Sequence, residues 1–331
     1  MKIALFGSGP ARVGKVYTPE ILEELKRFGE VSPLIGKKNA PEHRAFLADC
    51  EVGFATWGMP AFTKDEIKKY LPKLRILFYS AGTVQYFARP FLECGVRIVS
   101  AYAANAVPVA EYTFAQITLA AKGYFQAAKK YRPLLPVSYI RANRYPGNYK
   151  IKIGLIGLGA IGSAVAQKLK ALDAEVLACD PFASTEKAEK CGVRLVSMET
   201  LFSECDVISN HLANKKELNN YIDGRYFKLM KPHSAFINTG RGAQVNEYAL
   251  AAHLWAHPSC TAIIDVLKCD WLPYVSPLFW CHNAVLTPHI AGSTGKEPQR
   301  MALYMINELE NYLNGKPLQY EVTAEMLKTM A

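Results

Sequence analysis

Three polar residues in the second half of the chain have types and positions that suit chemistry. Each follows an apolar, strand-like run: Arg241 after Ala235–Asn238, Asp270 after Thr261–Asp265, and His289 after Ala284–Leu286. Ligands of an open parallel sheet collect at the carboxyl ends of its strands, so residues in these positions are candidates for a site. A histidine moves protons near neutral pH, and a neighbouring carboxylate fixes the orientation of its ring. The fork of an arginine suits a carboxylate ligand.

A glycine-rich segment ahead of these residues predicts a site for a dinucleotide phosphate. Gly157, Gly159 and Gly162 lie between a strand-like and a helix-like stretch. The first glycine permits a tight turn, the second lets a pyrophosphate approach bare backbone, and the third lets the helix pack close to the strand. The helix N-terminus adds free amides and a partial positive charge.

Asp180 extends this motif and indicates which dinucleotide binds. It lies eighteen residues after Gly162, at the end of the apolar run Ala174–Cys179, where a carboxylate can accept hydrogen bonds from an adenosine ribose. A 2′-phosphate would meet this negative charge, and the next residues, Pro181 and Phe182, supply no arginine. The pattern therefore favours NAD over NADP.

Together, these features predict a hydride-transfer site. Taken singly, Arg241 could form a surface ion pair, Asp270 could be a solvated acid, and His289 could be a hydrogen-bonded loop residue. A histidine acid/base, its carboxylate partner and an arginine beside a nicotinamide pocket are the parts needed to reduce a 2-keto acid. A second glycine-rich turn, residues 7–14, follows the first strand. Arg12 stands there in place of the third glycine, so we interpret it as a substrate-domain loop.

Composition narrows the class of protein. A chain of 331 residues, half of them hydrophobic, suits two globular domains. It has no apolar run near the roughly 18 to 20 residues of a membrane span, and its N-terminus lacks the apolar core of a signal peptide. We therefore expect a cytoplasmic protein that does not bind membranes. Eight cysteines without CxxC pairs predict reduced thiols and no metal site.

The formal charge of +10 does not indicate a nucleic-acid-binding protein. Lysines and arginines are spread along the chain and alternate with acids, so they form no basic stripe. A small anionic substrate is the better explanation.

Alternating strand-like and helix-like stretches predict an α/β fold with parallel sheets. In the first block the predicted strands are Lys2–Phe6, Val52–Trp57, Ile76–Tyr79 and Arg97–Val99, and the predicted helices are Pro19–Phe28, Pro41–Asp49 and Lys64–Leu71. The second block has six predicted strands: Lys152–Leu155, Glu175–Cys179, Asp206–Ser209, Ala235–Asn238, Thr261–Asp265 and Ala284–Leu286.

Three further segments complete this organisation. A long helix is predicted over Pro108–Lys130, with Pro108 near its first turn. An irregular, proline-bearing stretch follows over Arg132–Asn148. The helix predicted over Lys296–Leu313 comes too late for the nucleotide sheet, so we expect it to return to the first domain.

The motifs, in this order and spacing, resemble the D-isomer-specific 2-hydroxyacid dehydrogenase family over nearly the whole chain. Four segments carry the resemblance: 104–111 at the domain crossover, 157–162 at the cofactor loop, 238–242 around the arginine, and 287–292 around the histidine. The resemblance implies two doubly wound parallel-sheet domains, with a Rossmann NAD-binding domain (102–291) inserted into a flavodoxin-like substrate domain (1–101 and 292–331). It also implies a cleft at the hinge and a homodimer assembled through the NAD-binding domains.

The resemblance also assigns roles to residues. It implies that His289 protonates the keto oxygen while NADH delivers hydride, and that Arg241 binds the substrate carboxylate and carbonyl. The implied cofactor-binding set is Gly157, Gly159, Ala160, Ile161, Gly162, Asp180, Pro181, His211, Thr239, Asp265 and Val109. The implied substrate-binding set is Ser80, Ala81, Gly82, Thr83, Asn105 and Arg241, with the loop 80–83 offering backbone amides as an oxyanion-type nest does.

Two departures from the family pattern leave a second function open. The family usually has glutamate where Asp270 stands, so the carboxylate here is one methylene shorter and must reach His289 by backbone adjustment or through water. The family also tends to place proline and threonine in the loop after His211, where this chain has Leu-Ala-Asn-Lys-Lys, so His211 either lies near the nicotinamide ribose or only packs. The alternative is an NAD(H)-binding sensor or corepressor-like protein with weak or no catalysis.

Sequence does not size the substrate pocket. The aromatic candidates for the wall of this pocket are Trp57, Tyr79, Tyr102, Trp271 and Trp280. For each of them, packing in the core is the competing explanation.

Overall fold

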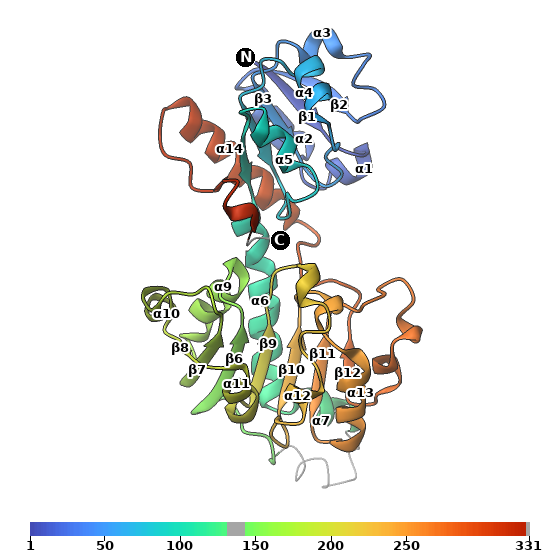
Figure 1. The fold of residues 1–331 in the computed structure, drawn as a ribbon, viewed down its shortest axis with the longest axis vertical. Coiled ribbons are helices and arrows are strands. Elements are labelled where there is room, and N and C mark those ends of the chain that lie inside the picture. Colours follow the sequence, from blue (N-terminus) through green and yellow to red (C-terminus); the bar gives the residue numbers. More distant parts are fainter. Residues whose placement is uncertain (131–142, 329–331) are drawn as a thin grey trace. The chain divides into compact units, whose positions relative to one another are not determined.

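A computed structural model describes residues 1–130 and 143–328, so most of the irregular stretch predicted over Arg132–Asn148 lies outside the described residues. The chain divides into two compact units: unit 1 comprises Met1–Asn105 and Ser293–Ala331, and unit 2 comprises Ala106–Gly292 (Figure 1). Each unit is an α/β sandwich built on its own sheet, which confirms the predicted fold class.

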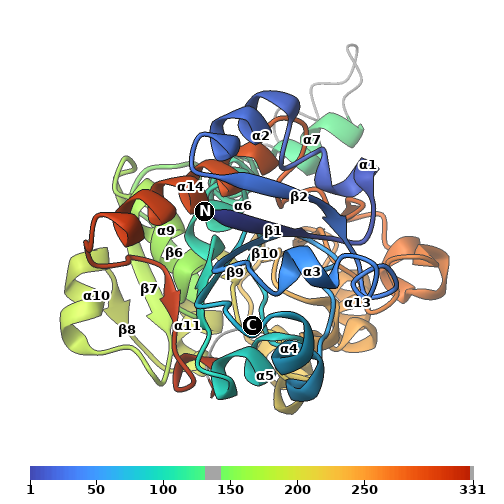
Figure 2. The same cartoon turned by 90° about the horizontal axis from the view of Figure 1, so that it is seen from above.

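The sheet of unit 1 has a flavodoxin-like order. Its strands are β1 (Lys2–Phe6), β2 (Glu30–Ile35), β3 (Val52–Ala55), β4 (Ile76–Tyr79), β5 (Arg97–Ser100) and β13 (Glu321–Val322). They are arranged β13-β5-β4-β3-β1-β2, and β1 and β2 lie side by side in Figure 2. Strands β1 to β5 are parallel, giving the order 2-1-3-4-5 of a doubly wound fold.

Two strands of this sheet were not predicted. β2 contains Pro33 and has exposed positions, because it is an edge strand that needs neither a full set of amide donors nor two buried faces. β13 has two residues and pairs antiparallel with β5, at the edge of a sheet whose other strands are parallel as predicted. A pair of residues carries too little periodicity to be read from sequence.

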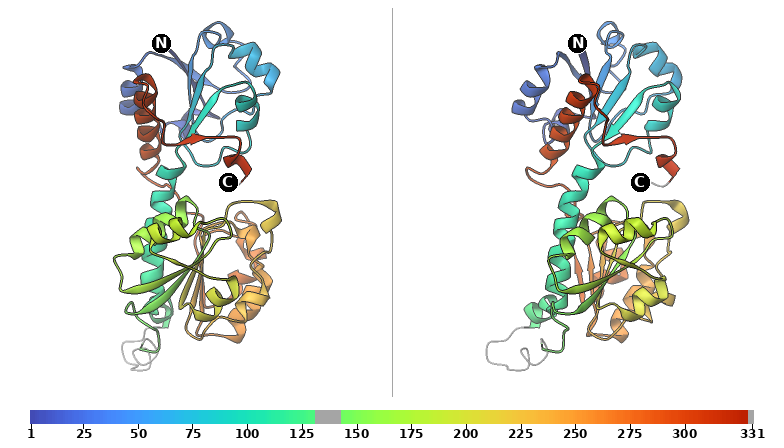
Figure 3. Two further views of the ribbon diagram at one scale, coloured as in Figure 1. Left: turned by 60° about the vertical axis from the view of Figure 1, so that its left-hand side comes forward. Right: turned by 90° about the vertical axis from the view of Figure 1, so that its left-hand side faces the viewer.

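Helices cover both faces of this sheet (Figure 3). They are α1 (Pro10–Val13), α2 (Pro19–Lys26), α3 (Arg44–Leu47), α4 (Lys64–Tyr70), α5 (Ala88–Glu93) and α14 (Pro298–Leu313). α14 contacts α2, β4 and β5, and α4 contacts α5. The buried side chains of α14, Met301, Met305 and Leu309 among them, belong to the same apolar core as the strands. The last helix is thus part of unit 1.

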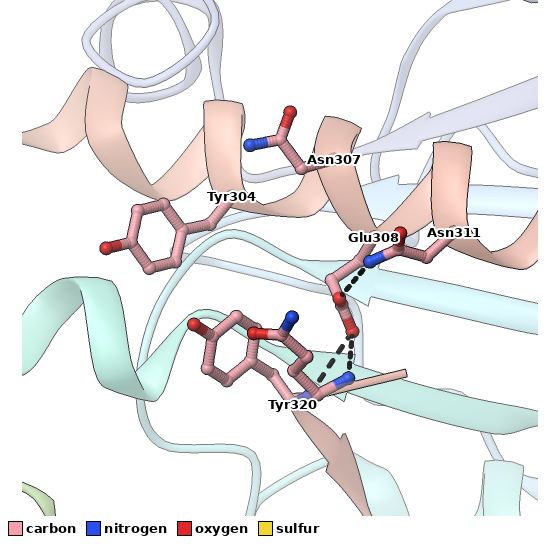
Figure 4. Close-up of a pocket in the computed structure, with 6 residues that line it drawn as sticks. Tyr304, Asn307, Glu308, Asn311 and Tyr320 are labelled. Carbon is pink, nitrogen blue, oxygen red and sulfur yellow. Dashed lines mark hydrogen bonds between the residues drawn. The ribbon is translucent and has the colours of Figure 1, made fainter. Parts of the chain in front are cut away.

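A buried carboxylate joins α14 to the last strand. Glu308 is 2% exposed and accepts hydrogen bonds from the backbone N of Gln319 (2.8 Å) and of Tyr320 (3.2 Å) and from Asn311 Nδ2 (2.9 Å) (Figure 4). Arg97 also binds Glu321 through two hydrogen bonds of 2.7 Å. These contacts hold β13 against β5.

The sheet of unit 2 has the dinucleotide-binding order. Its strands are β6 (Ile151–Ile156), β7 (Ala174–Cys179), β8 (Arg194–Leu195), β9 (Val207–Asn210), β10 (Ala235–Asn238), β11 (Thr261–Ile264) and β12 (Ala284–Leu286). The order β8-β7-β6-β9-β10-β11, extended by β12, is the 3-2-1-4-5-6 arrangement, and all its pairs are parallel. The six predicted strands are all present. The two-residue third strand, β8, was missed, and β12 is a seventh strand rather than the sixth.

Apolar side chains on the two faces of this sheet meet different helices. α6 (Tyr102–Ala121), α9 (Ala160–Leu169) and α10 (Thr185–Cys191) contribute to one core, and α11 (Met198–Glu204), α12 (Gly224–Phe227) and α13 (Glu247–Ala256) to the other. Figure 3 shows these layers on either side of the strands.

The helix predicted over Pro108–Lys130 starts earlier in the structure and is divided into two helices. α6 begins six residues earlier, so Pro108 lies inside it, and α7 (Tyr124–Lys130) is separate. Gly123, with φ of +66°, adopts a left-handed conformation and donates its N–H to the Ala120 carbonyl, which ends α6.

None of the described helices is long and apolar enough to cross a membrane. All eight cysteines are free. Within residues 1–130 and 143–328, no three His, Cys, Asp or Glu side chains gather as metal ligands would.

Candidate cofactor and catalytic site

The glycine turn between β6 and α9 leaves room for a ligand to approach the protein backbone closely. Gly157 has φ of +91°, and a Cβ on Gly162 would overlap the carbonyl of Gly157. A Cβ on Gly159, the N-cap of α9, would meet nothing within 4 Å, so space is open where a pyrophosphate would approach. Ala160 is exposed and Ile161 half-buried in the first turn of α9.

Asp180 ties this turn to the end of β7. Its carboxylate accepts hydrogen bonds from the backbone N of Leu158 (2.7 Å) and of Phe182 (2.9 Å). Each carboxylate oxygen has a second lone pair, so the group keeps acceptor capacity for a ribose hydroxyl. Pro181 and Phe182 are exposed beside it.

His211 is a buried histidine next to the glycine turn. It follows β9 and is 7% exposed, and its carbonyl oxygen is 3.0 Å from where a Cβ of Gly157 would stand. Neither ring nitrogen has a hydrogen-bond partner among the described residues. Burial lowers the pKa of this imidazole to about 3, so the ring is neutral at physiological pH. A neutral ring with unpaired nitrogens can both donate to and accept from a ligand.

The low pKa of His211 gives a testable acid sensitivity. A histidine whose pKa is lower in the folded than in the unfolded state does not reduce the free energy of unfolding above about pH 6.5. As the pH falls from there toward the folded pKa, the unfolded state takes up a proton that the folded state does not, so the free energy of unfolding decreases. We expect His211→Asn to remove up to about 2 kcal/mol of the loss in unfolding free energy between pH 7 and pH 5. Urea unfolding of both proteins at the two pH values measures this difference. Equal pH dependence in both proteins would contradict the neutral buried ring.

A buried amide network fixes the loops after β9 and β10. Asn210 Nδ2 donates to Asn238 Oδ1 (3.0 Å) and to Gln244 Oε1 (2.8 Å). Gln244 Nε2 donates to the carbonyls of Leu212 (3.1 Å) and Ala213 (2.8 Å), and its Oε1 also accepts from the backbone N of Arg241 (3.2 Å). Sequence reasoning missed Asn210 and Gln244. The available signal was an Asn at the end of a buried strand, where an apolar residue is expected.

Arg241 lies in this loop, and most N–H groups of its guanidinium have no hydrogen-bond partner in the described chain. Its Nη1 donates to the Gly240 carbonyl (2.7 Å), and no carboxylate within the described chain pairs with it. Burial lowers the pKa of the guanidinium and the nearby Asp270 partly opposes that shift, yet an arginine stays charged. A partly buried cation without an anionic partner is a site for an anionic ligand.

Asp270 and His289 make direct contact. Asp270 Oδ2 lies 3.2 Å from His289 Nδ1, and Asp270 Oδ1 accepts a hydrogen bond from the backbone N of Leu267 (2.7 Å). The shorter carboxylate thus contacts the imidazole directly, and the backbone of the loop holds it in place. His289 has φ of +56°, a left-handed conformation that is uncommon outside glycine and concentrates at functional sites.

Asp265 holds the loop that carries His289. This buried carboxylate accepts hydrogen bonds from Thr287 Oγ1 (2.6 Å) and from the backbone N of Ile290 (2.9 Å) and Ala291 (2.9 Å). Tyr112 on α6 hydrogen-bonds Thr287 (3.0 Å). Asp265 therefore fixes the position of the loop that carries His289.

Two more members of the predicted cofactor set are buried in unit 2. Thr239 is 7% exposed and faces the Thr113 hydroxyl at 3.4 Å, while Val109 is buried in α6.

In unit 1, buried hydroxyl groups shape the loop Ser80–Thr83. Tyr17 hydrogen-bonds Ser80 Oγ (2.6 Å), and Ser100 Oγ donates to the carbonyls of Ala81 and Gly82 (2.9 Å each). The amides of Ser80 and Ala81 donate to backbone carbonyls. In the described chain, only the amides of Gly82 and Thr83 remain free in this loop. Asn105 Oδ1, also in unit 1, accepts a hydrogen bond from Ser293 (3.3 Å).

Comparison with known proteins identifies relatives of this chain. The model of the NAD-binding domain of the D-isomer specific 2-hydroxyacid dehydrogenases matches residues 121–291. A D-3-phosphoglycerate dehydrogenase of Archaeoglobus fulgidus is 34% identical over 69% of this chain and 43% of its own length, so the chain spans less than half of that relative. A Staphylococcus haemolyticus protein assigned to the 2-hydroxyacid dehydrogenases is 32% identical over 74% of this chain and 77% of its own.

Solved structures share the fold over nearly the whole chain. D-mandelate dehydrogenase of Rhodotorula graminis superposes with a TM-score of 0.78 at 22% identity, covering 97% of each chain. A D-isomer specific 2-hydroxyacid dehydrogenase of Lactobacillus delbrueckii, in its NAD complex, gives 0.75 at 20% identity, covering 98% of this chain and 100% of that one. Residues 121–291 form an NAD-binding domain, and the chain belongs to the D-isomer specific 2-hydroxyacid dehydrogenase family.

Proposed function

We propose that this protein is an NAD-dependent D-2-hydroxyacid dehydrogenase that interconverts a small 2-keto acid and its 2-hydroxy acid. One observation carries the proposal: the Asp270 carboxylate holds Nδ1 of His289 and leaves Nε2 without a protein partner in the described chain. An imidazole oriented in this way is a general acid/base. It lies at the same edge of the sheet as the glycine turn.

The residues of unit 2 fit the cofactor. The open space at Gly159 and the unpaired ring of His211 are a cradle and a polar partner for it. The residues that would hold NAD are Gly157, Gly159, Ala160, Ile161, Gly162, Asp180, Pro181, His211, Thr239, Asp265 and Val109. When bound, the reduced nicotinamide supplies a hydride for the carbonyl carbon.

The side chains of the chain supply proton transfer and binding. In the reducing direction, His289 donates the proton on Nε2 to the keto oxygen, while Asp270 accepts a hydrogen bond from Nδ1 and stabilises the imidazolium. Arg241 binds the substrate carboxylate through its free N–H groups. In unit 1, the free amides of Gly82 and Thr83 are the proposed backbone donors to a substrate carboxylate, in an oxyanion-type role. In the oxidising direction His289 takes the proton back.

The domain roles and the assembly follow the same proposal. Unit 2 is the NAD-binding domain and unit 1 the substrate domain. The protein forms a homodimer through its NAD-binding domains, and its partner molecules are small anionic keto and hydroxy acids. The cytoplasmic location stays a prediction.

Turnover with purified protein tests the function. We expect NADH oxidation with at least one of glyoxylate, pyruvate, hydroxypyruvate, 3-phosphohydroxypyruvate or a bulkier 2-keto acid, and a product of D configuration. NADPH should be at least about tenfold poorer, because Asp180 repels a 2′-phosphate. Absorbance at 340 nm and chiral analysis of the product measure these outcomes. NADH binding without turnover of any keto acid would favour the sensor alternative, whose basis was the shorter Asp270.

A further inference from the structure

A tyrosine of helix α6 connects that helix with the loop that carries His289. The phenol oxygen of Tyr112 lies 3.0 Å from Thr287 Oγ1. Thr287 Oγ1 in turn donates to Asp265 Oδ1 at 2.6 Å, and the same carboxylate accepts the backbone amides of residues 290 and 291. Three polar groups in a row thus join α6 to the chain on both sides of His289.

The direction of these hydrogen bonds follows from the number of protons. A threonine hydroxyl has one proton and two lone pairs, and Thr287 gives its proton to the carboxylate of Asp265. The phenol of Tyr112 is therefore the donor to Thr287. Burial raises the pKa of this phenol and the charge of Asp265 adds to the shift, although the hydrogen bond with Thr287 opposes it. The phenol thus keeps its proton at neutral pH.

Packing of α6 does not require this hydroxyl. The helix meets the core of unit 2 through apolar side chains, Ala110, Ile117 and Ala121 among them. Tyr112 is half-buried, and a phenylalanine in its place would keep the same ring and the same apolar contacts. What the hydroxyl adds is one hydrogen bond, and that bond is made to the loop of His289.

We infer that Tyr112 is a positioning residue, whose hydroxyl acts through Thr287 to fix the loop of His289 for proton transfer. The inference rests on the proposed function and adds a residue to it. His289 has φ of +56°, and such a conformation persists only where the surrounding structure imposes it. Hydrogen bonds that end on a carboxylate polarise one another, so losing the bond from Tyr112 weakens the next one, from Thr287 to Asp265.

The effect should fall on proton transfer and spare substrate binding. The loop of Arg241 is held separately, by the hydrogen bonds of Asn210 and Gln244. A shift of about 1 Å at a reacting group can lower a rate about a hundredfold. Two backbone amides still bind Asp265 when the phenol is removed, so we expect a smaller displacement and a smaller loss.

Tyr112→Phe tests the inference, and Tyr145→Phe is the matched control. Tyr145 is also half-buried in unit 2, and it donates one hydrogen bond of the same length, 3.0 Å, to the carbonyl of Ser259. Ser259 precedes β11, whereas the residues of the proposed site follow their strands. Both variants should shift the midpoint of urea unfolding by a similar amount, because each loses one hydrogen bond.

We expect Tyr112→Phe to lower kcat for keto-acid reduction about tenfold, with KM for the keto acid and the dissociation constant of NADH changed less than about threefold. Tyr145→Phe should keep the kcat of the wild type. Hydrogen exchange of the segment 287–291, followed by mass spectrometry, should be faster in Tyr112→Phe and unchanged in Tyr145→Phe.

A double-mutant cycle shows whether Tyr112 acts through Thr287. Thr287→Val removes both the acceptor of Tyr112 and the donor to Asp265, so kcat should fall about thirtyfold. Adding Tyr112→Phe to it should cause no further loss, whereas independent effects would multiply to about three-hundredfold. Thr287→Ser, which keeps the hydroxyl, should recover most of the rate lost in Thr287→Val.

Three results would overturn the inference in an active wild type. They are a kcat of Tyr112→Phe within about twofold of the wild type, an equal loss in Tyr145→Phe, and losses that multiply in the double variant. A wild type that turns over no keto acid would instead contradict the proposed function, so the two failures are distinguishable.

Discussion

His289→Asn is expected to lower kcat for keto-acid reduction by about a thousandfold or more. The variant removes the proton donor, and general acid/base groups contribute typically 10² to 10⁴ in rate. Asparagine is the appropriate replacement because it tolerates the left-handed backbone conformation of residue 289, so the loop held by Asp265 should persist. Single-turnover kinetics of NADH oxidation measure the effect.

Two controls separate this loss from a structural one. NADH affinity should change less than about threefold, since His289 is outside the glycine turn and the proposed cofactor set. Asp270→Asn should lower kcat by a smaller factor, about 10 to 100, because it leaves the acid in place and weakens only its orientation. If His289→Asn retains a tenth of wild-type kcat, the assignment of His289 is wrong.

Arg241→Gln is expected to lower kcat/KM by about a thousandfold. A charge-assisted hydrogen bond contributes about 1.5 to 3 kcal/mol, so losing a two-pronged contact with the substrate carboxylate costs about 4 kcal/mol. The fold should be little affected, because among the described residues the side chain of Arg241 hydrogen-bonds only to the adjacent Gly240 carbonyl. Steady-state kinetics over a wide range of keto-acid concentration measure the change.

Arg241→Lys tests whether the planar shape of the guanidinium, and not only its charge, contributes to substrate binding. It keeps the charge but loses the planar fork, so its kcat/KM should lie between those of the wild type and Arg241→Gln. Equal activity of the lysine variant and the wild type would show that charge alone is sensed, and an unchanged kcat/KM in the glutamine variant would remove Arg241 from the substrate site.

Sequence predicts much of this fold because many of its strands are short, continuous apolar runs with clear boundaries. Ile76–Tyr79, Ala235–Asn238 and Ala284–Leu286 were predicted to the residue, since each is bounded by turn-forming or polar residues. The elements that were missed are short or lie at edges. β8 and β13 have two residues each, and their pairing is decided by tertiary contacts such as Arg97 with Glu321, which no local pattern contains.

The candidate site was predictable as a set of residue types and less so as a geometry. Arg241, Asp270 and His289 could be chosen because each follows a strand. The positive φ of His289 and the amide network of Asn210, Asn238 and Gln244 could not, because both depend on how loops from different strands meet. The direct contact between Asp270 and His289 was likewise open, because a difference of one methylene is within the range that a loop backbone can absorb.

Unit 1 is built from two separate stretches of the chain, and this affects the order in which the two units fold during synthesis. Unit 2 is a single stretch, 106–292, whereas the core of unit 1 contains Met301, Met305 and Leu309 from the far end of the chain. A ribosome releases the N-terminus first, so the first hundred residues wait, with part of their apolar surface uncovered, until the whole nucleotide-binding stretch has emerged. The inserted unit can acquire its structure earlier, and the interrupted one is completed last.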